Sequence, residues 1–417
     1  MPSTCSWPIC RGCEMAYSSQ IRAAVGAVRE SLAGVGVGVQ DRRFTQHGEH
    51  DPLPDAPLVL VACSGGRDSM ALAAVARTVC ASLGVRCGAV IIDHGLQAGS
   101  ERVARETAER CERLGLAPVV LSGVQVRESG TGVEAAARDA RYRALTAAAR
   151  ERGASAVLLA HTRDDQSETV LLGLLRSGGI DAIAGMPPTL DRDGVLFVRP
   201  FLELGRADTT AICEQLRVTW WDDPTNGEAA EGPLDARYPL RSRIRHDLMP
   251  ALARFMGADV SAVLARGARS ARHDKEYLDA EAERALADVA CFAGTADAVD
   301  GADTAGAAGA AGAAEPAGAD AVRVEERRER RAALLFDARK LGALHPAIRR
   351  RVIAHGLASV GVAGNQRQVE AIERLAVDWH GQGAVNLSGG YSANRQKHVI
   401  RVCQDGMHEN RGCSGSD

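Results

Sequence analysis

The stretch Leu58-Val-Leu-Val-Ala-Cys-Ser-Gly-Gly-Arg-Asp-Ser-Met-Ala-Leu72 decides the fold of this chain. Its first six residues form an apolar run rich in valine and leucine, which is typical of a buried strand in a parallel sheet. Good helix formers follow from Met70 onward. A polar, glycine-containing segment separates the two, so the pattern predicts a strand, a glycine turn and a helix in immediate succession.

The glycine turn has the features of an anion-binding loop. A turn that opens a helix presents a row of backbone N–H groups, and these donors and the helix dipole both favour negative charge. Gly65 and Gly66 let the backbone approach a phosphate without an intervening Cβ. Ser64 and Ser69 add hydroxyl donors, whereas Asp68 would repel a bare phosphate and therefore indicates a bridging Mg²⁺. The alternative is an ordinary turn capped by Ser64 or Asp68.

The six-residue motif differs from the two common phosphate-binding loops, G-x-x-x-x-G-K-[ST] and G-x-G-x-x-G. Ser-Gly-Gly-x-Asp-Ser instead resembles the pyrophosphate loop (PP-loop) of the N-type ATP pyrophosphatases, which split ATP between its α and β phosphates and adenylate a substrate. The resemblance implies an ATP site made of Ser64, Gly65, Gly66, Arg67, Asp68 and Ser69, with Asp68 as a ligand of Mg²⁺.

Composition restricts the class of protein. The chain has 417 residues, enough for two or three domains, and 46% are apolar without a run that could span a membrane. The net charge of −3 excludes a uniformly basic coat, so nucleic-acid binding would need local patches. Cys10-Arg-Gly-Cys13 lacks the second pair of a zinc site. We expect a soluble, cytoplasmic protein without a secretory signal or membrane partner, and we allow for a homodimer.

Strands and helices alternate along the first half of the chain. Apolar runs that predict strands are found at 58–63, 85–92, 117–121 and 156–160. Helical patterns follow these runs at about 100–114, 132–152 and from 164. The alternation predicts an α/β fold, a doubly wound Rossmann-like parallel sheet with right-handed crossovers. Ligands of such sheets lie beyond the C-terminal ends of the strands, where Asp93-His94-Gly95 and residues 161–168 also fall.

Composition and periodicity suggest six segments. Residues 293–320 are almost entirely Ala, Gly, Thr, Asp and Pro, and cannot bury enough side chain to offset the entropy of ordering. In the last segment we expect helices at 349–357 and 366–379, then a hairpin pairing 383–390 with 399–402. The segments are an N-terminal tail, helix and loop (1–57), the PP-loop domain (58–255), a helical extension (256–290), a disordered linker (291–331), a small α+β domain (332–403) and a tail (404–417).

A second polar motif, His161-Thr-Arg-Asp-Asp-Gln-Ser-Glu-Thr169, follows the strand predicted at 156–160. On a helix beginning near residue 163, Asp164 and Glu168 share a face, with Asp165 beside them. Helix capping by the threonine and Asp165 is the plainer explanation, but it leaves the histidine and a third acid unexplained. These carboxylates could hold Mg²⁺ or grip an amine, and His161 could contact a phosphate.

Arginines recur at helical spacing before that motif. Arg138 and Arg141 fall on one predicted helix, with Tyr142 beside them. A solvated arginine face is one explanation. The functional one makes Arg141 a clamp for a phosphate or a carboxylate.

Together these motifs resemble those of the bacterial tRNA(Ile)-lysidine synthetases. The likeness is strong over about 58–255 and looser over 332–403. Gln97 and Ser242 stand where that family often has Arg and Asn. The matching strings, in order, are Ser64–Ser69, Asp93-His94-Gly95-Leu96, Ala137-Arg138-x-x-Arg141-Tyr142, His161-x-x-Asp164-Asp165-Gln166-x-Glu168-Thr169, Gly185-Met186, Arg199-Pro200, Asp223-Pro224-x-Asn226 and Arg243-Ile244-Arg245-His246-x-Leu248-x-Pro250.

The resemblance implies a two-step reaction with ATP and Mg²⁺. The wobble cytidine of an isoleucine tRNA with a CAU anticodon attacks the α-phosphate through its C2 oxygen, and pyrophosphate leaves. The ε-amine of free L-lysine then attacks C2, and AMP leaves. Arg141 would stabilise the α-phosphate, and Asp164, Asp165 or Glu168 would accept the lysine ammonium. The resemblance also implies ATP contacts from His94 and His161, and basic patches for tRNA at Arg241, Arg243 and Arg245 and at Arg349, Arg350 and Arg351.

Two other functions are compatible with a PP-loop. A tRNA thiolation enzyme would usually need a catalytic cysteine or an iron–sulfur cluster, and no paired CxxC follows the site. A non-catalytic adenine-nucleotide sensor would not need three carboxylates around Asp164.

Overall fold

The computed structural model of the chain describes residues 17–45, 51–93, 95, 99–124, 133–223, 230–293 and 333–404. These belong to two compact units, Met1–Arg272 and His273–Asp417, and each is considered separately. Among the described residues, no single helix is both long and apolar enough to cross a membrane.

A six-stranded sheet in the order β3-β2-β1-β4-β6-β5 forms the centre of the first unit. Neighbouring strands are parallel except for the antiparallel pair β5–β6. The doubly wound parallel sheet is therefore confirmed, while β5 and β6 were not predicted, because each is a four-residue strand. The strands are β1 (Leu58–Ala62), β2 (Arg86–Asp93), β3 (Val119–Gly123), β4 (Ala154–Leu158), β5 (Thr189–Arg192) and β6 (Val195–Val198).

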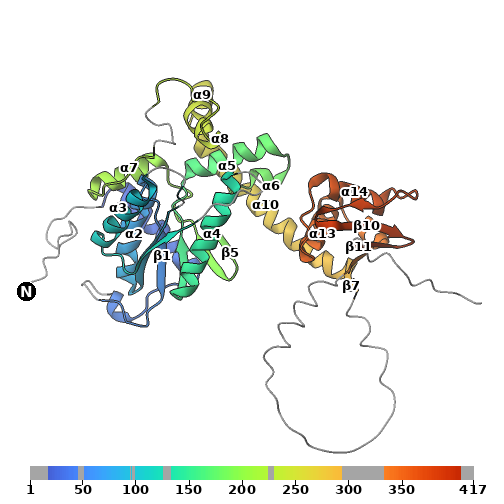
Figure 1. The fold of residues 1–417 in the computed structure, drawn as a ribbon, viewed down its shortest axis with the longest axis horizontal. Helices are drawn as coiled ribbons and strands as arrows, with labels where there is room; N and C mark the ends of the chain where they lie inside the picture. Colours follow the sequence, from blue (N-terminus) through green and yellow to red (C-terminus); the bar gives the residue numbers. More distant parts are fainter. Residues whose placement is uncertain are drawn as a thin grey trace, which may run out of the picture. The chain divides into compact units, whose positions relative to one another are not determined.

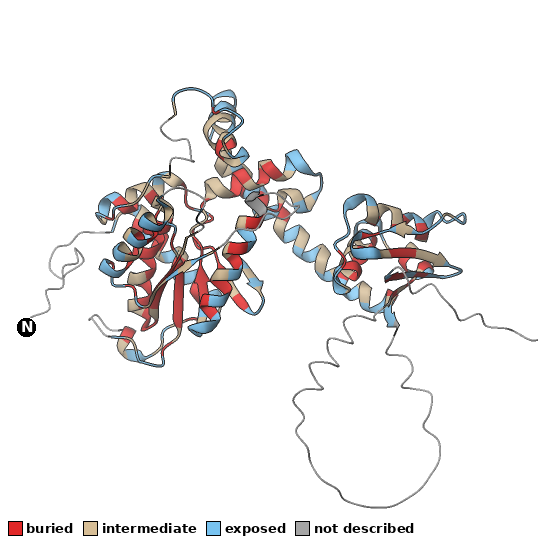
Figure 2. Cartoon of the chain, viewed as in Figure 1, coloured by how far each residue is buried: buried red, intermediate tan, exposed pale blue. Residues whose placement is uncertain are grey.

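Helices cover both faces of this sheet (Figure 1). Val59 and Val61 of β1 face one hydrophobic cluster, shared with α1 (Ser19–Gly34), α2 (Arg67–Leu83), α3 (Ser100–Arg113) and α7 (Arg206–Gln215). Leu58 and Leu60 face a second cluster, shared with α4 (Val133–Glu151). Because β1 is buried on both faces, its sequence is continuously apolar (Figure 2).

The strand order reverses between β1 and β4, since the chain builds β2 and β3 on one side of β1 and then crosses to the other. Ligands of doubly wound sheets bind at such a switch point. The PP-loop follows β1, and α5 (Arg163–Arg176) follows β4. The two motifs singled out in the sequence therefore flank the place where this fold binds ligands.

A run of helices completes the first unit. The helix expected over 256–290 is present, but α10 continues across the division between the two units. A π-helical turn, η3, interrupts the preceding run just before Pro250, which has no N–H to donate. The remaining elements are η1 (Arg42–Thr45), α6 (Ile180–Ile183), α8 (Leu240–Arg243), η3 (Ile244–Leu248), α9 (Met249–Met256) and α10 (Val260–Val289).

The second unit is an antiparallel sheet in the order β7-β8-β11-β10-β9, packed against helices through its own buried core. It confirms the small α+β fold expected near the C-terminus. Its elements are β7 (Ala290–Ala293), β8 (Ala333–Asp337), α12 (Ala338–Ala343), α13 (Pro346–Ser359), α14 (Gln366–Val377), β9 (Val385–Asn386), η5 (Ser388–Gly390), β10 (Tyr391–Gln396) and β11 (Val399–Gln404).

Two expectations for this unit need correction. The terminal hairpin pairs β10 with β11, not residues 383–390 with 399–402. Gly389 and Gly390, in the short turn η5 between β9 and β10, both have φ of 71°, so the chain turns there before β10 begins. The segment expected to be a linker from 291 onward begins in strand β7, and its residues 294–331 lie outside the described residues, as do the tails 1–14 and 405–417.

Candidate active site

The PP-loop is held by hydrogen bonds among its own residues. The Ser69 hydroxyl donates to the Gly66 carbonyl (2.8 Å) and accepts from the Ser64 backbone N–H (3.2 Å). Helix α2 begins within the loop, at Arg67, with Gly66 as N-cap and no side-chain hydrogen bond to the cap among the described residues. The suggestion that Ser64 or Asp68 caps this helix is therefore wrong. The first-turn N–H groups, without a capping side chain, suit an anion.

Gly65 is required by its backbone conformation and by its surroundings. Its φ is 83°, and a Cβ there would overlap the hydroxyl of Thr107 on α3. On its other side, the Trp221 backbone N–H donates to the Gly65 carbonyl (2.9 Å). Side chains and backbone from distant parts of the chain thus fix the shape of the PP-loop.

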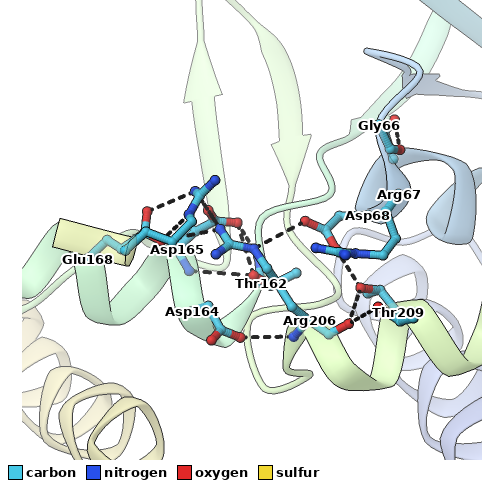
Figure 3. A network of polar contacts seen from close by, with 12 residues as sticks. Gly66, Arg67, Asp68, Thr162, Asp164, Asp165, Glu168, Arg206 and Thr209 are labelled. Atoms are coloured by element: carbon cyan, nitrogen blue, oxygen red, sulfur yellow. Dashed lines mark hydrogen bonds and ion pairs between the residues drawn. The ribbon is translucent and has the colours of Figure 1, made fainter. Parts of the chain in front are cut away.

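Four carboxylates meet around Arg206, the first residue of α7 (Figure 3). Its Nη2 donates to Asp165 Oδ1 (3.0 Å) and Glu168 Oε1 (3.2 Å). Its backbone N–H donates to Asp164 Oδ2 (2.9 Å), and its Nε lies 3.8 Å from Asp68 Oδ2. The acidic motif on α5 and the PP-loop carboxylate therefore belong to one charged network.

A second arginine reaches the same acids from the π-helical turn η3. Arg245 donates from Nε to Glu168 Oε1 (2.7 Å) and from Nη2 to Glu168 Oε2 (3.1 Å) and Asp165 Oδ1 (3.3 Å). Arg241 lies nearby, its Nη2 donating to Thr169 (2.8 Å). Glu168 has a side chain only 1% exposed, and burying a carboxylate is costly unless it has such partners.

Asp165 caps α5, the plainer of the two roles that the sequence suggested, and it also pairs with two arginines. Its Oδ2 accepts from the Thr162 backbone N–H (2.9 Å), which completes a capping box on α5. Its Oδ1 accepts from the two arginines. Burial alone would raise the pKa of Asp165, but the charges of Arg206 and Arg245 lower it to about 2. This carboxylate is ionised throughout the physiological range.

Asp68 lies in a different environment. Burial raises its pKa above the ordinary value, and the hydrogen bond that it accepts from the Thr209 hydroxyl reduces the shift. Thr209 is itself fully buried on α7. The chain thus keeps a costly carboxylate beside the PP-loop, which is typical of a functional site.

A cationic cluster lies on the other side of Asp165. Two buried nitrogens, His161 Nδ1 and Arg141 Nε, have no hydrogen-bond partner among the described residues. Burial, together with the nearby charges of Arg141 and Arg199, lowers the pKa of His161 to about 3, so its imidazole is neutral. Buried donors without a partner, next to several arginines and the single acid Asp165, suit an anionic group.

Comparison with known proteins gives two matching family models, a PP-loop domain over residues 40–252 and a TilS substrate binding domain over residues 336–402. The tRNA(Ile)-lysidine synthase of Bifidobacterium longum subsp. infantis is 56% identical over 408 residues, covering 95% of this chain and 100% of the relative. That of Streptomyces coelicolor is 42% identical over 84% of this chain and 86% of the relative. The chain belongs to the tRNA(Ile)-lysidine synthase family.

Membership makes the chain an ATP-dependent ligase that modifies tRNA, as the sequence motifs implied. It decides against the thiolation enzyme and the non-catalytic nucleotide sensor. Among solved structures, the U34-tRNA thiolase NcsA from Methanococcus maripaludis aligns with 61% of this chain and 80% of its own, at 14% identity and a TM-score of 0.44. That likeness is too distant to bear on function.

In this member of the lysidine synthase family, most of the residues singled out in the sequence lie in or next to the PP-loop. Ser64–Ser69, Asp164, Asp165, Glu168, Arg241 and Arg245 all contribute to the PP-loop or the network beside it. Arg245, assigned to tRNA, lies among the acids instead of on an open basic surface. His94 and Gln97 lie outside the described residues.

Sequence reasoning missed Arg206 and Thr209. No motif marks them, because they contact Glu168 and Asp68 from 38 and 141 residues away. Recognising β6 as a further parallel strand would have placed the start of α7 at the same edge of the sheet as the other motifs.

The arginines expected to bind tRNA in the second unit have partners within that unit. Arg349 is buried and donates from Nε to Glu373 Oε1 (2.9 Å). Arg350 donates to the other oxygen of Glu373 (2.6 Å), and Arg351 donates to Asp279 (2.6 Å). Arg350, with a side chain 52% exposed, is the member of the three most available to a ligand.

Gly65→Ala should weaken ATP binding by at least about tenfold, because the new Cβ meets Thr107 and residues with side chains avoid positive φ. Isothermal titration with an ATP analogue measures the effect. Adding Thr107→Ala should recover part of the affinity, since it removes the overlap and leaves the φ strain. Gly26→Ala on α1, where a Cβ meets nothing within 4 Å, is the matched control. Equal affinities for the Gly65 and Gly26 variants would contradict the prediction.

His161 should make the first unit less stable as pH falls from about 6.5 toward 3. The unfolded chain binds a proton over this range and the folded histidine does not, so stability is full above 6.5 and is lost on acidification. The slope is at most about 1.4 kcal/mol per pH unit. Urea unfolding at several pH values measures it for wild type and for His161→Gln, which should lack this contribution. Replacement of the exposed His273 by Gln should leave the wild-type pH dependence unchanged. If the unfolding free energies of wild type and His161→Gln changed in parallel with pH, His161 would not be the group responsible.

Proposed function

We propose that this chain ligates free L-lysine to C2 of the wobble cytidine of an isoleucine tRNA with a CAU anticodon, through an adenylated tRNA intermediate. The observation that carries the proposal is the meeting of Asp68, beside the PP-loop, with the α5 carboxylates across Arg206. A nucleotide site next to buried acids suits a reaction in which an activated base meets an amine. Pyrophosphate leaves in the first step and AMP in the second, as the amine nitrogen replaces the C2 oxygen.

A pocket beside the network supports lysine as the amine. Its volume is about 220 Å³, below the roughly 300–1,000 Å³ usual for drug-sized ligands, which suits one amino acid. Apolar side chains can cover the methylene chain, while the acids of the lining can accept the ammonium groups. The apolar lining is Met249, Pro250, Ala253 and Val260, and the acidic lining is Asp164, Glu168 and Asp259.

Mg²⁺ fits the residues beside the PP-loop. Within the described parts of the chain, no three His, Cys, Asp or Glu side chains form a metal cage of their own. Magnesium at nucleotide sites is usually held by one or two carboxylates together with phosphate oxygens. Asp68 would supply such a carboxylate, and the bound ion would neutralise phosphate charge.

Catalysis in this proposal depends on positioning and charge. The N–H groups of the PP-loop hold the pyrophosphate, and Arg141, with its unpartnered buried Nε, stabilises the α-phosphate. Asp164 or Glu168, which both line the lysine pocket, holds the lysine amine and accepts its proton. Neutral His161 can donate to an ATP oxygen.

Recognition of tRNA is assigned to one arginine in each unit, half-buried in the first and exposed in the second. Arg243 in the first unit and Arg350 in the second are the members of the predicted patches that fit best, since Arg245 and Arg349 are engaged by acids. An anticodon base must be splayed out to react, which suits recognition of a single-stranded loop. We place the reaction in the cytoplasm, where tRNA is available, and a homodimer stays a prediction.

The test is one incubation of the full chain with ATP, Mg²⁺, labelled L-lysine and an isoleucine tRNA transcript with a CAU anticodon. Label should enter the tRNA, and AMP and pyrophosphate should form in equal amounts. A methionine tRNA transcript, which shares the anticodon, should stay unlabelled. Pyrophosphate release without incorporation of lysine would overturn the proposal.

A further inference from the structure

Arg206 occupies the junction between the two halves of the site. It contacts Asp68 on one side and Asp165 and Glu168 on the other, and its side chain is only 16% exposed (Figure 3). The hydroxyl of Thr209 lies within hydrogen-bonding distance of both the Arg206 carbonyl and Asp68, and its one hydrogen can go to either. A single cation therefore links the PP-loop carboxylate with the carboxylates on α5.

The α5 acids have a second cation that does not depend on Arg206. Arg245 makes three hydrogen bonds to Glu168 and Asp165, of 2.7, 3.1 and 3.3 Å. Breaking a buried ion pair is costly mainly because it leaves one charge uncompensated. Since Arg245 remains, Arg206 can leave Asp165 and Glu168 without stranding them.

Both substrates of the proposed function interfere with the ion pairs of Arg206: ATP phosphates would attract its guanidinium, and the lysine ammonium would compete with it for carboxylates. A triphosphate in the PP-loop brings several negative charges next to Asp68, and a guanidinium binds phosphate oxygens in pairs. A lysine ammonium needs carboxylate oxygens, and Arg206 already donates to Asp165 Oδ1 and Glu168 Oε1. Two like charges at the same oxygens repel each other.

We propose that Arg206 is a positioning residue that exchanges carboxylates for nucleotide phosphate, so that ATP binding opens the lysine site. In the ligand-free protein Arg206 covers the α5 carboxylates. With nucleotide bound, its guanidinium turns to the phosphates and leaves one acceptor position of Glu168 Oε1 open to the ammonium, beside the hydrogen bond from Arg245. Linkage then requires that lysine also tighten nucleotide binding by the same factor. The inference rests on the proposed function, because it takes lysine as the amine.

The test is a calorimetric titration of the full chain with L-lysine, with and without saturating α,β-methylene-ATP and Mg²⁺. In wild type the analogue should tighten lysine binding at least about tenfold, within the roughly 5–150-fold usual for coupled sites. In Arg206→Gln, lysine should bind without nucleotide, and the ratio of the two affinities should fall close to one. Arg206→Lys keeps a cation and should keep part of the ratio.

Arg269→Gln serves as the matched control, because Arg269 forms an exposed ion pair with Glu203 outside the network and should keep the wild-type ratio. A wild-type ratio near one overturns the proposal. So does an unchanged ratio in Arg206→Gln, which would assign the coupling to direct attraction between phosphate and ammonium. Equal weakening of lysine binding with and without nucleotide would reveal a merely structural arginine.

The labelled-lysine incubation distinguishes failure of the Arg206 exchange from failure of the proposed function. If lysine enters the tRNA while the affinity ratio does not depend on Arg206, the proposed function stands and the exchange of partners fails. If lysine neither binds nor enters the tRNA, the proposed function itself fails.

Discussion

Asp68→Asn is expected to lower tRNA-dependent pyrophosphate release by roughly 10²–10³-fold, the usual cost of removing one electrostatic group from a preorganised site. The amide keeps the shape of the side chain but cannot serve as a charged ligand of Mg²⁺. Folding should not suffer, because burial raises the pKa of Asp68 and its charge therefore costs stability at neutral pH. Pyrophosphate release over a Mg²⁺ titration, together with a melting curve, checks both halves of the prediction.

Thr209→Val is the graded control for this experiment. It removes the hydroxyl that donates to Asp68 and leaves the carboxylate in place. We expect a smaller loss than in Asp68→Asn, of about 10- to 150-fold at most, with a higher Mg²⁺ requirement, since one hydrogen bond to a charged group contributes about 1.5–3 kcal/mol. If Asp68→Asn released pyrophosphate at nearly the wild-type rate with an unchanged Mg²⁺ dependence, Asp68 would have no part in the chemistry.

Glu373→Ala should destabilise the second unit by about 3–5 kcal/mol, because it leaves Arg349 buried without a counter-charge. The carbonyls of Gly342 and Leu344 still accept from Arg349, at 3.0 and 2.9 Å, but carry no net charge. Hydrogen exchange of peptides from α13 and α14 measures the loss locally, which avoids treating two units as one transition.

Glu370→Ala, on the same helix, is the matched control and should change protection by no more than about 0.5 kcal/mol. Comparing Glu373→Ala with Glu370→Ala also distinguishes a structural role of Arg349 from a role in tRNA binding. If Arg349 binds phosphate, Glu373→Ala should free it and tighten tRNA binding without loss of protection. That outcome would contradict the ion pair as the main role of Arg349.

Local patterns were enough to predict much of this protein. The apolar run of β1, the glycine turn and the helix after it depend on neighbours in sequence, so the PP-loop could be identified from its own residues. The helices α3, α4 and α5 each pack on the sheet, and the sequence predicted all three at nearly their observed positions. The short strands β5 and β6 carry too few residues to show a period.

Assignments of charged residues were less secure, because a side chain's partner is not written next to it. Arg245 and Arg349 were expected to meet tRNA phosphates, yet one lies against Glu168 and the other against Glu373. An arginine has the same appearance in sequence whether it faces solvent, a phosphate or a buried acid. Its partner depends on which helices the fold packs together.

The sequence by itself therefore determined the α/β sheet, the PP-loop and the acidic motif, since each is specified by residues a few positions apart. Only the tertiary structure decided that Arg206 and Thr209 join the PP-loop to those acids, across 38 and 141 residues. The packing of α7 against α2, with the first residue of α7 hydrogen-bonded to the first turn of α5, brings these side chains within hydrogen-bonding distance. Periodicity reports which face of an element is buried, and carries no information about which polar groups meet across the interface.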